Sequence, residues 1–216
     1  MFINLSKNFI YLRVPKTGST SVSQHLVDTF GSMSDSLYTT INILNIEGKA
    51  LHNQELIKSM NAHSTISQII EKGIVSKDFV KQTNIYACLR NPVERFLSMC
   101  YHLRTFSALP ETFGANRNKL VEVGLARFDP QWHMWWSQTS WCLLNNEPVN
   151  KLFLYEDINK TAKEITGEDK PLVHRHRDDS FEIAQDGSLD QSLVQEIEKL
   201  YIEDVKLYNS LLHARK

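Results

Sequence analysis

The sequence predicts an α/β domain of three layers, in which a mostly parallel central sheet lies between helices. Two observations lead to this prediction. Short apolar runs rich in β-branched and aromatic residues alternate along the chain with segments whose apolar residues recur at helical spacing. The chain has 216 residues and shows neither an internal repeat nor an interdomain linker. We therefore expect a single domain over residues 1–216.

The beginning of the chain predicts one strand followed by one helix. Residues 9–14 form a short apolar run that is closed by Pro15, as is typical of a buried strand. Residues 19–30 then carry apolar side chains four positions apart, and Gly31 provides a stop. This strand and helix enclose the polar stretch "PKTGSTS".

The following segments differ in the strength of their patterns. Residues 38–44 and 53–60 are weakly patterned and favour a short strand and a helical piece. "NAHSTISQIIEKG" predicts an extended piece that ends at His63 and a helix that is closed by Gly73. Residues 85–89 are aromatic, apolar and β-branched, as in a strand that is buried on both faces.

A well-marked helix follows the strand over residues 85–89. Asn91 can cap it, Pro92 stands at its first position, and Glu94 follows the cap by three residues, which is the spacing of a capping box. Its apolar face is formed by Phe96, Leu97, Cys100 and Tyr101. The sequence thus predicts a second point at which a strand leads directly into a helix.

The rest of the chain predicts an irregular insertion over residues 107–130 and an aromatic helix, "PQWHMWWSQTSWCLL". The segment "KLFLYEDI" predicts a strand, and residues 188–212 predict a closing helix with a polar face. Because Trp132 and Trp136 stand four positions apart on the expected helix, a core role is favoured for both, although a platform that stacks on a sugar is the alternative.

Composition narrows the function classes. The net charge of −1 predicts no binding of nucleic acid through a global basic field, so any anion site must be local. No apolar run approaches the roughly 18 residues of a membrane span. The N-terminus lacks the basic start and apolar block of a signal peptide, so we expect a cytoplasmic protein. The three cysteines lack zinc-ligand spacing and are expected to be free buried thiols.

The stretch "PKTGSTS" has the composition of an anion-binding loop. It precedes a helix N-terminus, where backbone N–H groups and the helix dipole attract negative charge. Lys16 supplies a full charge, Gly18 allows close approach of the backbone, and the neighbouring Thr and Ser residues supply hydroxyl groups. The alternative is that Ser19 or Thr20 only caps the helix. The order of lysine and glycine excludes the P-loop pattern GxxxxGK[ST].

A second group of polar side chains follows the strand over residues 85–89. Arg90 stands at the strand end, and Arg95 and Ser98 share one face of the following helix. Guanidinium groups suit a terminal phosphate, although an ion pair with Glu94 is the alternative for Arg95. Two separate anion sites of this kind fit a nucleotide that carries phosphates at both ends of its ribose.

Together these two motifs resemble those of the PAPS-dependent sulfotransferases. "PKTGSTS" is similar to their 5′-phosphosulfate loop, and "LRNPVERFLSMCYH" to their 3′-phosphate motif. Three further segments resemble the carbohydrate-type branch, which is membrane-associated or bacterial and is known as family 2: "NAHSTISQIIEKG", "SQTSWCL" with "KLFLYEDI", and "LYIEDVKLYNSLL". The likeness covers most of the chain and is weakest over residues 32–60 and 105–130. It implies the P-loop-NTPase-like sulfotransferase fold.

The resemblance also implies roles for individual residues. The co-substrate would be PAPS (3′-phosphoadenosine 5′-phosphosulfate), the product PAP, and the acceptor a hydroxyl group of a carbohydrate. The residues implied for the 5′-phosphosulfate are Lys16, Thr17, Gly18, Ser19, Thr20 and Ser21. Arg90 and Ser98 would hold the 3′-phosphate, with Arg95 as either a further ligand or a structural residue. His63 would be the general base.

Some features remain open at this stage. Gln138 is a candidate contact of acceptor or sulfate, and the loop "HRHR" at residues 174–177 either lines the substrate entrance or is a solvated basic loop. The Gly-Asp-Trp-Lys loop of the small-molecule branch is absent, which disfavours a phenol or steroid acceptor. No metal is expected. The competing functions are a nucleotide kinase using Mg²⁺ with Glu156 and Asp157, and a nucleotide-binding module without catalysis.

Overall fold

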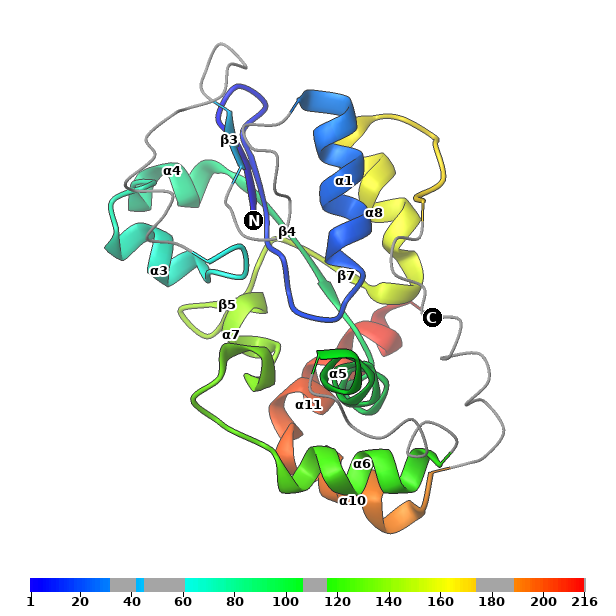
Figure 1. Cartoon of the computed structure of the whole chain (residues 1–216). Coiled ribbons are helices and arrows are strands. Elements are labelled where there is room, and N and C mark those ends of the chain that lie inside the picture. The colour runs from blue at the N-terminus through cyan, green and yellow to red at the C-terminus, as the bar shows by residue number, and fades with distance from the viewer. Residues whose placement is uncertain (32–41, 45–60, 107–115, 174–188, 216) are drawn as a thin grey trace. The chain divides into compact units, whose positions relative to one another are not determined.

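A computed structural model of the chain describes residues 1–31, 42–44, 61–106, 116–173 and 189–215. The polypeptide forms two compact units (Figure 1). The first unit contains Met1–Leu89 and Gln138–Arg175, and the second contains Arg90–Ser137 and His176–Lys216. Whether they constitute one domain, as expected from the sequence, stays a prediction.

The first unit is built on a sheet that has five strands among the described residues, in the order β3-β1-β2-β4-β7. The strands are β1 (Phe2–Asn4), β2 (Phe9–Tyr11), β3 (Asn42–Leu44), β4 (Asn84–Leu89) and β7 (Lys151–Leu154). β1 and β2 pair in an antiparallel hairpin, and the other three pairs are parallel. The predicted α/β class and mostly parallel sheet are therefore confirmed.

Two details of the sheet differ from the sequence-based expectation. The predicted strand over residues 9–14 ends at Tyr11, although the amide of Leu12 still donates to the carbonyl of Tyr86 at 2.8 Å. β1 was not predicted, because three residues are too few to show a strand period. It forms because Asn8 adopts a left-handed backbone with φ 53° and turns the chain back on itself.

Helices flank this sheet, as predicted. α1 (Ser19–Phe30) and α8 (Ile158–Thr166) lie together on one side of the strands, and α3 (Ile66–Glu71) and α4 (Lys77–Gln82) lie on the other (Figure 1). The core under α1 and α8 is formed by Phe2, Phe9, Tyr11, Val22, Leu26, Tyr86, Cys88, Ile158, Ala162 and Leu172. This packing fixes where α1 begins, and with it the loop that precedes α1.

The predicted helix over residues 19–30 is confirmed in its bounds and in its stop at Gly31. The helix expected before Gly73 is α3, which begins after a capping box between Thr65 and Gln68. α4 and α8 were not predicted. The strand expected over residues 38–44 is confirmed in its described part, which is β3 (Asn42–Leu44). Residues 38–41, the helical piece expected at 53–60 and the loop at 174–177 lie outside the described residues.

The described part of the second unit is helical. It contains α5 (Pro92–Phe106), α6 (Arg117–Ala126), α10 (Gln191–Leu200) and α11 (Ile202–Ala214). Its core gathers around Phe96 and is formed by Phe96, Leu97, Met99, Cys100, Tyr101, Leu120, Val121, Met134, Trp135, Ile197 and Tyr201. The predicted closing helix is interrupted at Tyr201, so it is two helices.

Two predictions for the middle of the chain were wrong. Part of the expected insertion over residues 107–130 is the helix α6. Cys100 and Phe96 pack so closely against this helix at Gly124 that a Cβ atom there would meet both side chains. The expected aromatic helix is broken into a 3-10 turn (His133–Trp135) and the short α7 (Thr139–Cys142). The break lies at Trp136, whose ψ of 150° is extended.

This break also changes which tryptophans are buried. Trp135 and Trp141 are 2% and 0% exposed, whereas Trp132 and Trp136 are partly exposed. The core role expected for Trp132 holds in part, because it packs against the core around Phe96. The four-residue spacing that favoured Trp132 and Trp136 holds only on a continuous helix. The cysteine prediction, in contrast, is confirmed: all three thiols are free and buried, and burial raises the pKa of Cys88 and of Cys100 to about 12.

Candidate active site

Residues 15–21 contain the end of the connection from β2 and the first residues of α1, and they are called the Lys16 loop below. The loop turns sharply because Lys16 and Gly18 both adopt left-handed backbone angles, with φ 64° and φ 71°. For lysine this conformation costs roughly 1–2 kcal/mol. The hydroxyl of the buried Thr17 donates to the carbonyl of Val14 at 3.0 Å and closes the turn. Strain at a non-glycine residue persists only where its surroundings hold it, as they do here.

Gly18 is the N-cap of α1, so this helix has no N-cap side chain that could accept from its first amides. The first bonds of the helix are donated by the amides of Ser21 and Val22 to the Gly18 carbonyl, at 3.0 and 3.4 Å. The amides of Ser19 and Thr20 come before them, at the positive end of the helix dipole. The alternative that Ser19 or Thr20 is the capping residue is therefore excluded.

The glycine at position 18 is needed for a second reason, which the sequence did not reveal. A Cβ atom at Gly18 would lie 2.5 Å from Cδ1 of Ile158 and 2.8 Å from Cε2 of Tyr155. These two residues mark the passage from β7 into α8. The Lys16 loop thus rests directly on the start of α8, and that contact leaves no room for a side chain.

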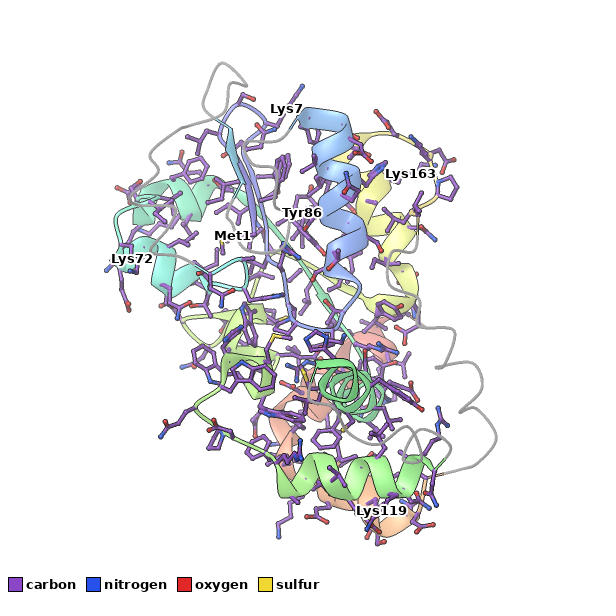
Figure 2. All side chains as sticks on the ribbon, viewed as in Figure 1. Met1, Lys7, Lys72, Tyr86, Lys119 and Lys163 are labelled. Atoms are coloured by element: carbon purple, nitrogen blue, oxygen red, sulfur yellow. The ribbon has the colours of Figure 1, made fainter. Side chains whose placement is uncertain are left out.

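Lys16 differs from the lysines at the surface of the first unit. Lys7, Lys72 and Lys163 are exposed and lie at the periphery of this unit (Figure 2). Lys163 pairs with Asp169 at 2.8 Å. Lys16 is half-buried and sits in a strained turn beside a helix N-terminus. A fixed positive charge in this place suits an anion.

Arg13 connects the Lys16 loop to the predicted base. The arginine is 2% exposed, and its Nη2 donates to Oγ1 of Thr20 at 3.4 Å. Its backbone carbonyl lies 2.6 Å from Nδ1 of His63. The strand end before the Lys16 loop therefore contacts both the loop and the histidine.

This contact determines the tautomer of His63. A carbonyl oxygen only accepts, so Nδ1 of His63 must carry the hydrogen that it donates to Arg13. In the neutral ring the basic lone pair is then at Nε2. The backbone of His63 is also fixed: its amide donates to Oδ1 of Asn61 at 2.9 Å, and its carbonyl accepts from Nε1 of Trp141 at 2.6 Å.

The second predicted site, residues 90–98, follows β4 and belongs to the second unit. Asn91 caps α5 as predicted, because its Oδ1 accepts from the amides of Val93 and Glu94 at 3.0 and 3.2 Å. The carboxylate of Glu94 lies 3.6 Å from the Arg90 guanidinium, whose side chain is 12% exposed. Ser98 follows Glu94 by one helical turn and so lies on the same side of α5.

Arg95 has a structural environment. It is buried, and its Nη2 donates to the carbonyls of Met134 and Trp136, both at 3.0 Å. The guanidinium also lies over the ring of Tyr201, 5.7 Å from its centroid. Burial raises the pKa of Tyr201 to about 12, and its hydroxyl donates to the Trp135 carbonyl at 2.9 Å. The fold thus uses Arg95 and Tyr201 to hold the broken aromatic segment.

The structure therefore brings together part of the predicted site. In the first unit, Arg13 joins the Lys16 loop to His63 through its carbonyl and its side chain. Arg90, Arg95 and Ser98 belong to the second unit. Sequence reasoning missed Arg13, Asn61 and Trp141. The available signal was weak: an arginine inside an otherwise apolar strand run, and an apolar residue within the quoted segment "SQTSWCL".

Comparison with known families identifies the family of the chain. The model of the sulfotransferase family, family 2, matches residues 1–209. The chain belongs to the sulfotransferase family. Neither the curated proteins nor the solved structures contain a significant match to it. Membership implies a transferase of sulfuryl groups, EC 2.8.2.-, with PAPS as its co-substrate, and it confirms the family resemblance of the two motifs.

Family membership also decides against the kinase alternative. Its candidate carboxylates, Glu156 and Asp157, follow β7 in a short 3-10 turn.

Within the described ranges, no three His, Cys, Asp or Glu side chains lie close enough together to hold a metal ion. None of the helices that the structure describes is sufficiently long and apolar to cross a membrane.

Proposed function

We propose that this sulfotransferase transfers the sulfuryl group of PAPS to a hydroxyl group of a carbohydrate, with His63 as the general base. The observation that carries the proposal is the 2.6 Å contact between Nδ1 of His63 and the carbonyl of Arg13. It leaves the basic lone pair of the neutral ring at Nε2. It also ties the histidine to the strand end from which the Lys16 loop begins.

The Lys16 loop would bind the 5′-phosphosulfate. The amides of Ser19 and Thr20 precede the hydrogen-bonded part of α1, and the N-cap Gly18 offers them no side-chain acceptor. Lys16 adds a full positive charge beside them. Oxygen atoms of a phosphate accept from such groups readily. The donor of Thr17 is already used by the Val14 carbonyl, so we assign that residue to the turn.

The reaction would be an in-line displacement at sulfur. The acceptor hydroxyl oxygen attacks the sulfur atom and forms the new S–O bond, while its proton passes to Nε2 of His63. The bond between sulfur and the bridging oxygen breaks, and its electron pair leaves on the 5′-phosphate of PAP. Lys16 and the start of α1 stabilise the charge that develops there. Sulfuryl transfer resembles phosphoryl transfer, for which positioning and charge stabilisation supply most of the catalysis.

Arg90 and Ser98 would hold the 3′-phosphate. Arg90 directly follows β4, and its guanidinium lies 3.6 Å from the half-exposed carboxylate of Glu94. A phosphate could compete for this guanidinium, because the contact with Glu94 is long at 3.6 Å and the carboxylate is half in solvent, which weakens an ion pair. Arg95 is assigned to structure instead, because two backbone carbonyls and the Tyr201 ring engage its guanidinium.

The carbohydrate acceptor rests on the likeness of three segments to the carbohydrate-type branch. We would test it by incubating the enzyme with PAPS labelled in its sulfuryl group and a panel of acceptors: acidic and neutral polysaccharides, and phenols and steroids. We expect label in polysaccharide, and none with Lys16→Ala or His63→Ala. Labelling of phenols alone would overturn the carbohydrate assignment, and full activity of His63→Ala would overturn the assigned base.

Nucleotide binding provides an independent test. In the presence of a metal chelator, PAP should raise the melting temperature clearly more than ATP does. Binding of PAP without transfer to any acceptor in the panel would support the alternative of a catalytically inactive module. Equal stabilisation by ATP and PAP would contradict the assignment of two phosphate sites.

A further inference from the structure

Trp141 is one of two fully buried tryptophans in the described chain, and its indole N–H has a specific partner. The residue is 0% exposed and belongs to α7 in the first unit. Its Nε1 donates to the backbone carbonyl of His63 at 2.6 Å. The residue therefore touches the proposed base from a segment 78 positions further along the chain.

His63 precedes the capping box of α3, so its own helix does not hold it. Its position depends on the turn just before it and on contacts from two distant segments. Asn61 accepts from the amide, Trp141 donates to the carbonyl, and Arg13 accepts from the ring. The first two fix the backbone on both sides of the Cα atom. The third then fixes the rotation of the ring and the tautomer.

We propose that Trp141 is a positioning residue for His63. Its hydrogen bond holds the His63 backbone where Nδ1 meets the Arg13 carbonyl, so that the basic lone pair stays at Nε2. The proposal rests on the assignment of His63 as the base. It concerns Trp141 alone, which acts through His63 and needs no contact with nucleotide or acceptor.

The chemistry favours a role beyond packing. An indole N–H in the interior needs an acceptor, but any backbone carbonyl satisfies this need. Here the acceptor belongs to His63, whose ring also bonds to the Arg13 carbonyl just before the Lys16 loop. Loss of the bond would leave the His63 carbonyl without this partner and would release the peptide unit that carries the ring. A shift of about 1 Å in a catalytic group can lower the rate 100-fold.

The test compares Trp141→Phe with Trp135→Phe. Both changes remove an indole from a buried site, but Trp135 lies in the second unit, in the core around Phe96. For Trp141→Phe we expect kcat to fall about 10- to 100-fold while the Kd for PAP changes less than twofold. For Trp135→Phe we expect the melting temperature to fall with kcat nearly unchanged.

A spectroscopic measurement separates positioning from stability. Nitrogen-15 NMR of the imidazole distinguishes the two neutral tautomers. In the wild type the His63 ring should be the tautomer protonated at Nδ1, and in Trp141→Phe it should become a mixture. If Trp141→Phe folds poorly, Asn61→Ala is the second variant, because it removes another anchor of the same backbone from an exposed position. It should lower kcat several-fold with little change in melting temperature.

The outcomes are distinct from those of the functional proposal. Full activity of His63→Ala would remove the base and the positioning role with it. Loss of activity in His63→Ala, together with wild-type kcat and tautomer in Trp141→Phe, would overturn only the positioning role. An equal fall of kcat in Trp141→Phe and Trp135→Phe, with the His63 tautomer unchanged, would overturn it as well, because loss of packing would then explain the effect.

Discussion

The chain contains two passages from a parallel strand into a helix, and they use their polar groups in opposite ways. β2 and β4 are parallel neighbours, and each leads within a few residues into a long helix. At α1 the N-cap is Gly18, and no N-cap side chain can meet the first amides. At α5 the side chain of Asn91 accepts from two of these amides.

The difference shows that a helix N-terminus is available to an anion only where the protein does not cap it itself. At α1, backbone amides and Lys16 can act together on a phosphate. At α5, the cap is filled, and the proposed 3′-phosphate would be bound by side chains such as Arg90 and Ser98. On this proposal, two sites that look alike in sequence would differ in chemistry, one based on the backbone and the other on side chains.

The largest effects should come from the charged residue of each passage. Lys16→Ala should lower kcat about 100- to 1,000-fold, because it removes a donor that acts on the leaving phosphate. Arg90→Ala should mainly weaken binding of the nucleotide, by about tenfold or more, because one charge-assisted contact is lost. Steady-state kinetics with varied PAPS would measure both effects.

Nucleotide analogues should separate the two passages further. The wild type should bind PAP more tightly than 5′-AMP, which lacks the 3′-phosphate. Arg90→Ala and Ser98→Ala should reduce this preference for PAP. Lys16→Ala should weaken the binding of both ligands and leave the preference unchanged. If Lys16→Ala loses the preference and Arg90→Ala keeps it, the assignment of the 5′ and 3′ ends is reversed.

The glycine at the first passage offers the next largest effect. Gly18→Ala should destabilise the protein by about 3 kcal/mol, because the left-handed backbone and the contact with Ile158 both oppose a Cβ atom. Gly73→Ala is the matched control: its φ of 68° is nearly the same, but nothing lies within 4 Å of the added Cβ. It should cost about 1 kcal/mol in chemical denaturation and leave PAP binding unchanged. An equal loss in both variants would mean that the contact with α8 is unimportant.

The sequence predicted the elements whose local signals agree with their packing. The sequence marks the stop of α1 at Gly31 and the start of α5 at Asn91 and Pro92, and β4 is apolar from Ile85 to Leu89. α6 was missed because Gly124 weakens the helical pattern, and only the close approach of Cys100 explains the glycine. The aromatic segment has a helical period, but buried contacts from Arg95 and Tyr201 to its carbonyls hold it in a broken form.

The candidate site was predictable only in part, for a related reason. The two anion motifs are contiguous in the chain, so composition and spacing reveal them. The support of His63 is distributed: Arg13 and Trp141 stand 50 positions before it and 78 positions after it. No local pattern connects such residues. Likewise, position 18 requires glycine because a Cβ atom there would meet Ile158, a residue distant in sequence that the fold places beside it.

A smaller effect on stability is expected at Arg95, the residue of the second passage to which we assign a structural role. Arg95→Ala should lower the free energy of unfolding by about 2 kcal/mol, because the Met134 and Trp136 carbonyls lose a buried donor. Arg95→Lys should recover part of the loss. Where folded, both variants should bind PAP with nearly wild-type affinity in calorimetry. A large loss of affinity without loss of stability would instead identify Arg95 as a phosphate ligand.

The smallest effect tests the difference between the caps directly. Asn91→Ala should cost about 1 kcal/mol, the usual contribution of an N-cap side chain, whereas Ser19→Ala should cost less than about half of that, because the N-cap of α1 is Gly18 rather than Ser19. With PAP bound, Ser19→Ala should keep most of the thermal shift, because the substitution leaves the backbone amide of residue 19 in place, and Asn91→Ala should leave the shift intact. Equal costs of the two substitutions would mean that both helix ends are capped alike, and a thermal shift lost in Ser19→Ala would mean that the site at α1 depends on a side chain rather than on the backbone.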